Sequence, residues 1–185
     1  MSEILGTLFK YLLALLAIAA VVAVLYEALS SNKESTAVSQ ITSLQANLSQ
    51  LYAGSNGGSF DSTPADLVKA GVVPSSMVSG SGTSTSLVDP WGGAVTLATA
   101  STTAGGTGIQ ITLKNVPQAA CVKLVSTLLS AMDQITFGSS GSDTLTASTG
   151  VDLSSLVSNG CSNTSGNTIN FIFPANVQST AGGSS

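Results

Sequence analysis

Cys121 and Cys161 are the side chains with the most distinctive chemistry in this 185-residue sequence. The chain contains no histidine, so the two cysteines cannot complete a four-ligand zinc site with nearby imidazoles. An even number of cysteines in a chain rich in Ser, Thr and Gly is typical of a structural disulfide formed outside the cytoplasm. The alternative is two free, buried thiols. We expect the disulfide.

The other polar residues do not form a catalytic constellation in the sequence. Histidine, the usual general base, is absent, and no lysine lies in an S-x-x-K setting that would activate a serine. Only Asp143 and Asp152, in polar loops, are placed to suggest calcium, which requires six or more oxygen ligands. Solvated loop acids are the simpler interpretation. We therefore expect no enzyme activity, no cofactor and no metal.

The charge composition excludes some partners. Charged residues make up 8% of the chain, hydrophobic residues 43%, and the formal net charge is -4. The cations are five lysines without a basic run, so the chain cannot gather the several cations that bind nucleic-acid phosphates. We expect a weakly acidic, folded protein with no nucleic-acid partner.

An apolar run near the N-terminus is the first element that must position other groups. Residues 11–26 contain no charged side chain, and apolar neighbours on both sides extend the zone to about 25 residues, long enough to span a bilayer. Lys10 lies inside this zone, where a long side chain reaches the headgroups. A cleavable signal peptide is not indicated, because Glu3 precedes any lysine and no A-x-A site is followed by a mature start.

The apolar run continues into an amphipathic segment without a Pro or Gly between residues 7 and 53. We therefore predict one helix of roughly 75 Å from near the N-terminus to Ala53, with Gly54 as its stop signal. Its first half is apolar on all sides and must be buried in lipid or protein, whereas its second half needs a globular domain on one side only. The apolar residues of that second half recur at spacings of three and four: Val38, Ile41, Leu44, Leu48, Leu51 and Tyr52.

The rest of the chain is predicted to be a small, loop-rich domain tied together by the disulfide. A second long helix over residues 116–135 carries a buried stripe: Cys121, Leu124, Val125, Leu128 and Met132. The other elements follow in chain order: a flexible connection (55–59), a short helix capped by Ser62 or Thr63 (62–71), an exposed loop (72–86), a turn and strand (89–99), a hairpin connection (101–108), a half-buried strand (109–115), a loop (137–150), a last strand (167–176) and a mobile tail (178–185).

Four segments in this order resemble the type IVb pilin family over nearly the whole chain. The apolar helix merges into an amphipathic one ending QLYAG, and DPWGG resembles the turn that enters the pilin sheet. NVPQAACVKL resembles the helix that carries the first disulfide cysteine, and NGCSNTSGNTINFIF resembles the second cysteine with the final strand.

The resemblance implies the type IV pilin fold, an α+β class in which a long N-terminal helix packs on a small antiparallel sheet with a second helix. It divides the chain into an anchor that later forms the filament core (1–29), a globular domain (30–177) that includes the amphipathic half-helix (30–53), and the tail (178–185).

The resemblance also implies a function. The chain would be a major subunit that waits in the inner membrane of a Gram-negative bacterium and polymerises into an extracellular pilus for adhesion, aggregation or conjugative mating contact. Its partners would be other copies of itself, a prepilin peptidase and the inner-membrane assembly machinery. The alternatives are a minor pilin, a type II secretion pseudopilin and a membrane-anchored periplasmic binding domain.

The chain departs from the family pattern at its N-terminus. Most pilins carry glutamate at mature position five, where this sequence has Leu5, and Glu3 is the only acid nearby. Glu3 either pairs with the Met1 amine of the next subunit or favours the helix dipole. Lys10 lies two helical turns after Glu3 on the same face, and either forms an ion pair between subunits or reaches the headgroups.

Overall fold

The structure is a computed structural model that describes residues 2–53, 58–59, 63–138, 143–146, 148–175 and 177–178. Within these ranges, the side chains of residues 2–8, 22–30, 53, 58–59, 143 and 177–178 are not described. The tail predicted over 178–185 therefore lies outside the described residues, apart from Gln178.

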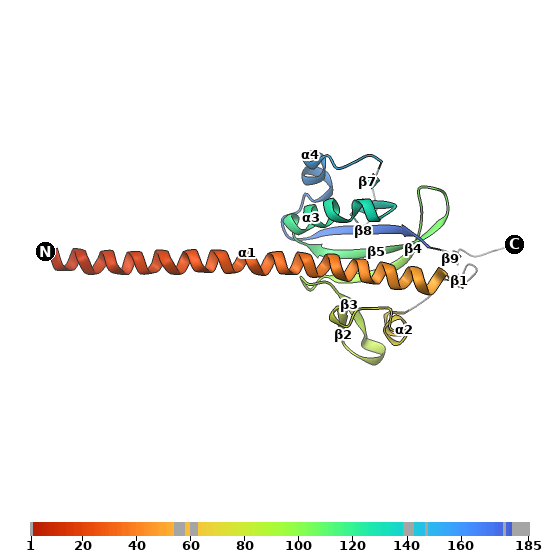
Figure 1. The fold of residues 1–185 in the computed structure, drawn as a ribbon, viewed down its shortest axis with the longest axis horizontal. Coiled ribbons are helices and arrows are strands. Elements are labelled where there is room, and N and C mark those ends of the chain that lie inside the picture. Colours follow the sequence, from red (N-terminus) through yellow and green to blue (C-terminus); the bar gives the residue numbers. More distant parts are fainter. Residues whose placement is uncertain are drawn as a thin grey trace.

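The first element is a single helix, α1 (Ser2–Ala53), of 52 residues. It runs unbroken from the N-terminus across the whole globular part, and its first half extends away from every other element (Figure 1). At 1.5 Å per residue a helix of this length spans roughly 78 Å. The prediction of one long helix ending at Ala53 is confirmed.

The second half of α1 buries one stripe of side chains against the sheet. Its buried members are Ala37, Ile41, Leu44, Leu48 and Tyr52. Leu51 was predicted to belong to this stripe and does not, because 46% of its surface is exposed. It lies at the edge of the stripe and lines an open groove of about 300 Å³ beside Gly71 and Val72, so no neighbouring element covers it.

A short helix, α2 (Pro64–Lys69), follows α1 and is capped as the sequence predicts. The backbone N–H of Asp66 donates to the Thr63 hydroxyl at 3.3 Å, and that hydroxyl donates to the Asp66 carboxylate at 2.7 Å. Thr63 is thus the cap. Gly71 has φ of 72°, a left-handed conformation that glycine adopts without strain, and it turns the chain after the helix.

The main sheet has seven strands in the spatial order β2-β3-β4-β5-β8-β6-β7, and every neighbouring pair is antiparallel. The predicted strands over 89–99, 109–115 and 167–176 correspond to its three longest members, β4, β5 and β8. The bounds are β2 (Val78–Ser79), β3 (Ser86–Val88), β4 (Ala94–Ser101), β5 (Thr107–Val116), β6 (Gln134–Phe137), β7 (Asp143–Thr146) and β8 (Asn167–Pro174).

Three segments predicted as loops or connections contain short strands. The segment 72–86 holds β2 and the start of β3, together with two 3-10 turns (Ser75–Met77 and Gly82–Ser84), and Met77 is buried. The segment 137–150 holds β7, and the connection 55–59 ends in β1 (Gly58–Ser59), which pairs in parallel with β9 (Val177–Gln178). Strands of two to four residues are too short to show an alternating pattern in the sequence.

The second long helix is shorter than predicted. It comprises α3 (Gln118–Leu128) and a 3-10 turn (Leu129–Ala131), and residues 134–137 form β6 instead of helix or loop. Ile135 pairs with Phe171 of β8 on one side and with Leu145 of β7 on the other. Pairing with the free edge of β8 overrides the local helical pattern, as tertiary context commonly does.

The core lies between the sheet and the two helices α1 and α3. All five predicted members of the α3 stripe are buried, and they belong to the same hydrophobic core as inward side chains of β5 and β8, such as Ile111 and Phe171. A short helical segment, α4 (Leu153–Ser155), continues as a π-helical turn (Leu156–Gly160) and leads to Cys161. The α+β fold with a long helix on an antiparallel sheet is confirmed.

Candidate functional site

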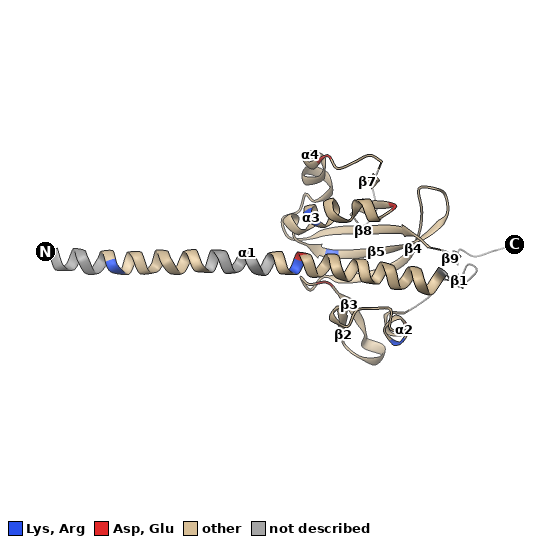
Figure 2. Cartoon of the chain, in the orientation of Figure 1, with Lys and Arg blue, Asp and Glu red and all other residues tan. Residues whose placement is uncertain are grey.

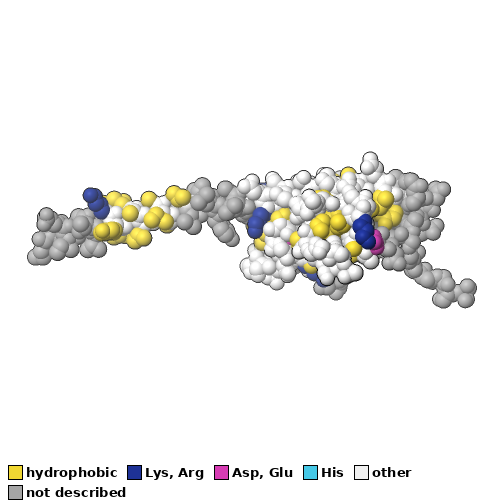
Figure 3. All heavy atoms as spheres, turned by 90° about the horizontal axis from the view of Figure 1, so that it is seen from below, with side chains coloured by type: hydrophobic (Ala, Val, Ile, Leu, Met, Phe, Trp, Pro, Cys, Tyr) yellow, Lys and Arg dark blue, Asp and Glu magenta, His cyan; other side chains and the backbone are white. Residues whose placement is uncertain are grey.

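The projecting half of α1 is the most unusual surface of the described chain. Every residue from 9 to 21 is exposed, and Lys10 is the one charged residue among them. The large side chains are uncovered on all sides of the helix, with exposed fractions from 52% for Leu13 to 72% for Tyr11. Figure 3 shows the apolar atoms along this segment, against the mostly polar surface of the globular part. An apolar surface of this extent marks an interaction site.

Among the described residues, no helical stretch combines the length and the hydropathy needed to cross a membrane.

An ion pair marks the place where α1 enters the globular part. Lys123 of α3 donates to the Glu34 carboxylate of α1 at 2.6 Å. Glu34 is buried, with 8% of its surface exposed, whereas Lys123 remains largely exposed. A buried carboxylate needs a partner of opposite charge, so this contact ties α3 to α1 at the point where the projecting half begins. The sequence analysis did not identify Glu34, because a charged residue in a helix is normally solvent-exposed.

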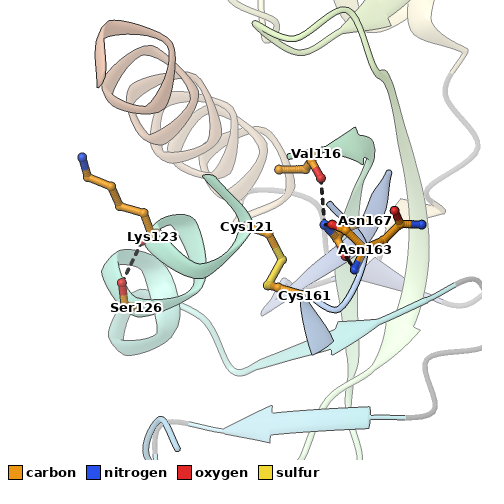
Figure 4. Close-up of a disulfide and its surroundings, with 7 residues drawn as sticks. All are labelled: Val116, Cys121, Lys123, Ser126, Cys161, Asn163 and Asn167. Atoms are coloured by element: carbon orange, nitrogen blue, oxygen red, sulfur yellow. Dashed lines mark hydrogen bonds between the residues drawn. A yellow bond between two sulfur atoms is a disulfide. The ribbon is translucent and has the colours of Figure 1, made fainter. Parts of the chain in front are cut away.

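The disulfide holds the other side of α3. Cys121 and Cys161 are both fully buried, and their Cα atoms lie 5.8 Å apart (Figure 4). The loop after Cys161 is fixed by Asn167, whose side chain donates to the carbonyls of Val116 and Asn163. The disulfide therefore links the start of α3 to the segment that enters β8.

The DPWGG segment forms a tight turn with a buried acid. The Oδ1 atom of Asp89 accepts hydrogen bonds from the backbone N–H of Trp91 at 2.9 Å and of Gly93 at 2.8 Å. Its Oδ2 atom is buried and has no hydrogen-bond partner. Burial raises the pKa of Asp89, and the backbone donors and the charge of Lys33 only partly offset that effect.

Gly93 has no room for a side chain in this turn. A Cβ atom there would collide with the backbone carbonyl of Lys114 and lie 2.7 Å from Oδ2 of Asp89. The turn is thus packed directly against the end of β5, which the sequence pattern alone did not indicate.

The remaining candidate residues do not come together in the described part of the chain. Lys10 is exposed, and Met1 and the side chain of Glu3 lie outside the described residues. Asp152 accepts a hydrogen bond from the backbone N–H of Ser154 at 3.0 Å and so caps α4, while the side chain of Asp143 is not described. Among the described residues no group of three acidic or cysteine side chains is placed to hold a metal ion.

Comparisons with known proteins agree with this architecture. The family model described as the PilS N-terminal domain matches residues 31–174, which is more than half of the chain. The crystal structure of a type IVb pilin from Salmonella typhi has 26% sequence identity and a TM-score of 0.60, over 76% of this chain and 99% of that one.

A second solved structure shows the same fold at lower identity. The type IV pilin TcpA from Vibrio cholerae El Tor biotype has 16% identity and a TM-score of 0.57, over 77% of this chain and 99% of that one. No curated protein sequence matches the chain. Both solved structures are type IV pilins, and the fold that this chain shares with them is the type IV pilin fold. The chain belongs to the PilS family of type IVb pilins, whose members are structural subunits of pili.

Proposed function

We propose that this chain is the major subunit of an extracellular type IVb pilus on a Gram-negative bacterium. The observation that carries the proposal is the surface of residues 9–21, which is apolar on all sides of the helix apart from Lys10 and which no other described element covers. Burying one large apolar side chain contributes about 1.5–3 kcal/mol, so eight of them supply a strong drive toward an apolar environment.

Two environments cover a helix that is apolar all round. One is lipid, where the backbone of a helix satisfies its own hydrogen bonds; the other is a bundle of identical helices. We propose that residues 1–29 anchor the subunit in the inner membrane first and form the filament core after assembly. Residues 30–177 then form the globular shell, with 30–53 as the part of α1 that packs on the sheet, and 178–185 form a mobile tail.

The partners follow from this sequence of events. Other copies of the chain contact it through their N-terminal helices, a prepilin peptidase processes it, and inner-membrane assembly machinery extracts it from lipid. Adhesion, aggregation and conjugative mating contact are the uses that such a filament serves.

The charges near the N-terminus are proposed to set the register between subunits. A charge enclosed in a helix bundle requires a partner of opposite sign, and Glu3 and Lys10 are the charged residues in the first ten positions. We propose that Glu3 pairs with a cation of the adjacent subunit, either Lys10 or the amine of Met1 if that residue is the mature terminus.

Replacing Glu3 tests this register. Glu3→Ala is expected to accumulate in the membrane like the unmodified chain and to yield few filaments, because the cation of the neighbour loses its partner. Asp152→Asn removes an acidic charge of the globular surface while keeping the cap of α4, and serves as the control. Filaments sheared from cells, pelleted and quantified against membrane-resident subunit give the readout. An unchanged filament yield would contradict the pairing between subunits and would favour the alternative, in which Glu3 interacts only with the dipole of its own helix.

Shearing intact cells tests the function itself. The released material is pelleted and analysed by electron microscopy and intact-mass spectrometry. Thin filaments composed mainly of this chain would establish the major subunit. A chain found only as a rare component of filaments would be a minor pilin, and one that stays with the inner membrane while protein secretion fails without it would be a pseudopilin. Either result would overturn the proposal.

A further inference from the structure

At the end of the globular part from which α1 projects, the lysines are exposed and the acids are buried. Three of the five lysines of the chain lie there, and all three are exposed: Lys33 on α1, Lys114 near the end of β5 and Lys123 on α3. The acids between them are buried, with 8% of the surface of Glu34 and 5% of that of Asp89 exposed. We call these three lysines the lysine collar.

An ion pair, a charge interaction and a packed turn link the three collar lysines to the two buried acids. Lys123 pairs with Glu34, the residue that follows Lys33. The charge of Lys33 acts on Asp89, and the turn of Asp89 packs through Gly93 on the backbone of Lys114. Figure 2 shows lysines on α1 and β5 at this end, where α1 leaves the globular part.

The other described charges on the globular surface do not form a second positive patch. Lys69 pairs with Asp66 at 3.7 Å, Asp133 binds the backbone and hydroxyl of Thr103, and Asp152 caps α4. The whole chain carries a net charge of -4, whereas the exposed charged side chains that the structure describes at this end are all lysines. Such an asymmetry orients a molecule toward a negative surface.

The spacing along α1 matches a bilayer. Lys10 and Lys33 are separated by about 35 Å of helix at 1.5 Å per residue, and a hydrocarbon core is about 30 Å thick. With the intervening residues in lipid, Lys10 lies at one headgroup region and the collar at the other. Glu27 falls near the same boundary in the sequence, and counted with Glu34 and Asp89 it brings the formal charge of this end to zero. The basic character of the end therefore lies in its described exposed side chains, because Glu34 and Asp89 are buried.

We propose that the lysine collar binds the anionic phospholipid headgroups of the leaflet from which the globular part emerges. This contact would hold the globular part against the membrane before the subunit is extracted. The inference rests on the anchoring of residues 1–29 under Proposed function, and it adds a binding surface and a ligand class to the membrane-resident stage.

Trp91, the one tryptophan of the chain, supplies a native reporter because it lies in the Asp89 turn beside the collar. The full chain is reconstituted in nanodiscs of phosphatidylcholine alone or mixed with phosphatidylglycerol, and a lipid with a spin label on its headgroup quenches the fluorescence of Trp91. Quenching is expected to be stronger with phosphatidylglycerol and to weaken as salt is added.

The variants separate the collar from general charge effects. K33Q with K114Q leaves the ion pair of Lys123 and Glu34 intact and is expected to lower the docking equilibrium roughly 30-fold, since each lysine near an anionic surface contributes about fivefold. K69Q on α2 removes one positive charge outside the collar, and its Trp91 quenching is expected to equal that of the unmodified chain. Circular dichroism of each variant establishes that it is folded.

Three outcomes overturn the proposal in distinguishable ways. Quenching that does not depend on phosphatidylglycerol shows that the collar does not bind anionic lipid. Lipid-independent quenching combined with loss of filaments in K33Q/K114Q assigns the collar to an acidic surface of a second copy. A chain that does not enter nanodiscs at all contradicts the anchor under Proposed function, and the lipid contact with it.

Discussion

The two halves of α1 belong to one unbroken helix but bury their side chains in different ways. Residues 34–52 bury a stripe that ends at Tyr52 and leave the opposite face polar, because the sheet of the same chain covers one side. Residues 9–21 are exposed on all sides and carry apolar groups throughout, apart from Lys10. The apolar side chains of residues 34–52 are buried by the same chain, whereas those of residues 9–21 need lipid or other chains to bury them.

This difference separates stability from assembly. The folding free energy of the globular part is expected to depend on the stripe of residues 34–52 and on what fixes α3 to it. Filament formation is expected to depend on residues 9–21 and to be largely independent of that free energy. Substitutions in the two halves therefore test the comparison directly.

The largest effect is expected from a charge in the projecting half. Leu16→Glu should abolish filaments, because a charge at the centre of an apolar helix costs about 2.5–3.5 kcal/mol in lipid and is unpaired in a bundle. The free energy of unfolding of the globular part should change by less than about 0.5 kcal/mol. Leu44→Ala should instead lower the free energy of unfolding of the globular part by about 2–5 kcal/mol, because it removes a buried side chain of the second half of α1 and none from the projecting half.

Filament yield and urea denaturation followed by Trp91 fluorescence measure the two quantities. Thr42→Glu places the same new charge on an exposed position of the second half and serves as the control. The comparison fails if Leu16→Glu unfolds the globular part, or if Leu44→Ala leaves its stability unchanged.

The disulfide is expected to give the next largest effect, confined to the globular part. The closed loop has a sequence separation of 40, for which the chain-entropy model gives about 4 kcal/mol. Replacing both Cys121 and Cys161 by Ser should lower the free energy of unfolding by that amount, and reduction of the unmodified chain should reproduce the loss. Denaturation curves with and without reductant provide the measurement. Equal stability of the oxidised chain and the double variant would show that the disulfide contributes nothing.

The sequence predicts most of the elements whose pattern is local. The uninterrupted helical pattern predicts α1, and the spacing of its buried residues predicts α3. Alternation predicts β5 and β8, and the DPWGG turn predicts the strand β4 that follows it. The projecting half of α1 was equally predictable, because its hydropathy requires no knowledge of the fold.

The elements that depend on distant partners were not predictable. Ile135 continues the apolar pattern of α3 in the sequence but lies in a strand, because β8 offers an unpaired edge there. The sequence alone suggests that Glu34 is a solvent-exposed helix residue. In the folded chain α3 places Nζ of Lys123 2.6 Å from Oε2 of Glu34. Asp89 reads as an ordinary turn residue, and only the packing of the turn on β5 explains its burial.

The smallest effect is expected at Asp89, close to where the two halves of α1 meet. Asp89→Asn keeps the acceptor for the N–H groups of Trp91 and Gly93 but removes a charge that burial disfavours. Burial raises the pKa of Asp89 in the folded chain above its ordinary value of 3.8, so the folded state binds the proton more tightly than the unfolded state does. The contribution of Asp89 to the stability of the unmodified chain is therefore expected to fall as the pH rises from about 3.8 through the folded pKa.

Asp89→Asn lacks this titration and should be at least as stable as the unmodified chain at neutral pH, with the difference closing on acidification. Asp89→Ala loses the acceptor itself and should cost about 1–3 kcal/mol, since the buried N–H of Gly93 and the partly buried N–H of Trp91 lose their partner. Urea denaturation of the three chains between pH 3 and pH 7 distinguishes the two contributions. If Asp89→Asn is as unstable as Asp89→Ala at neutral pH, then the charge of Asp89 stabilises the turn, and Lys33 must compensate its burial in full. In that case α1 would fix the turn by charge, and the boundary between the two halves of the helix would contribute to folding as well as to assembly.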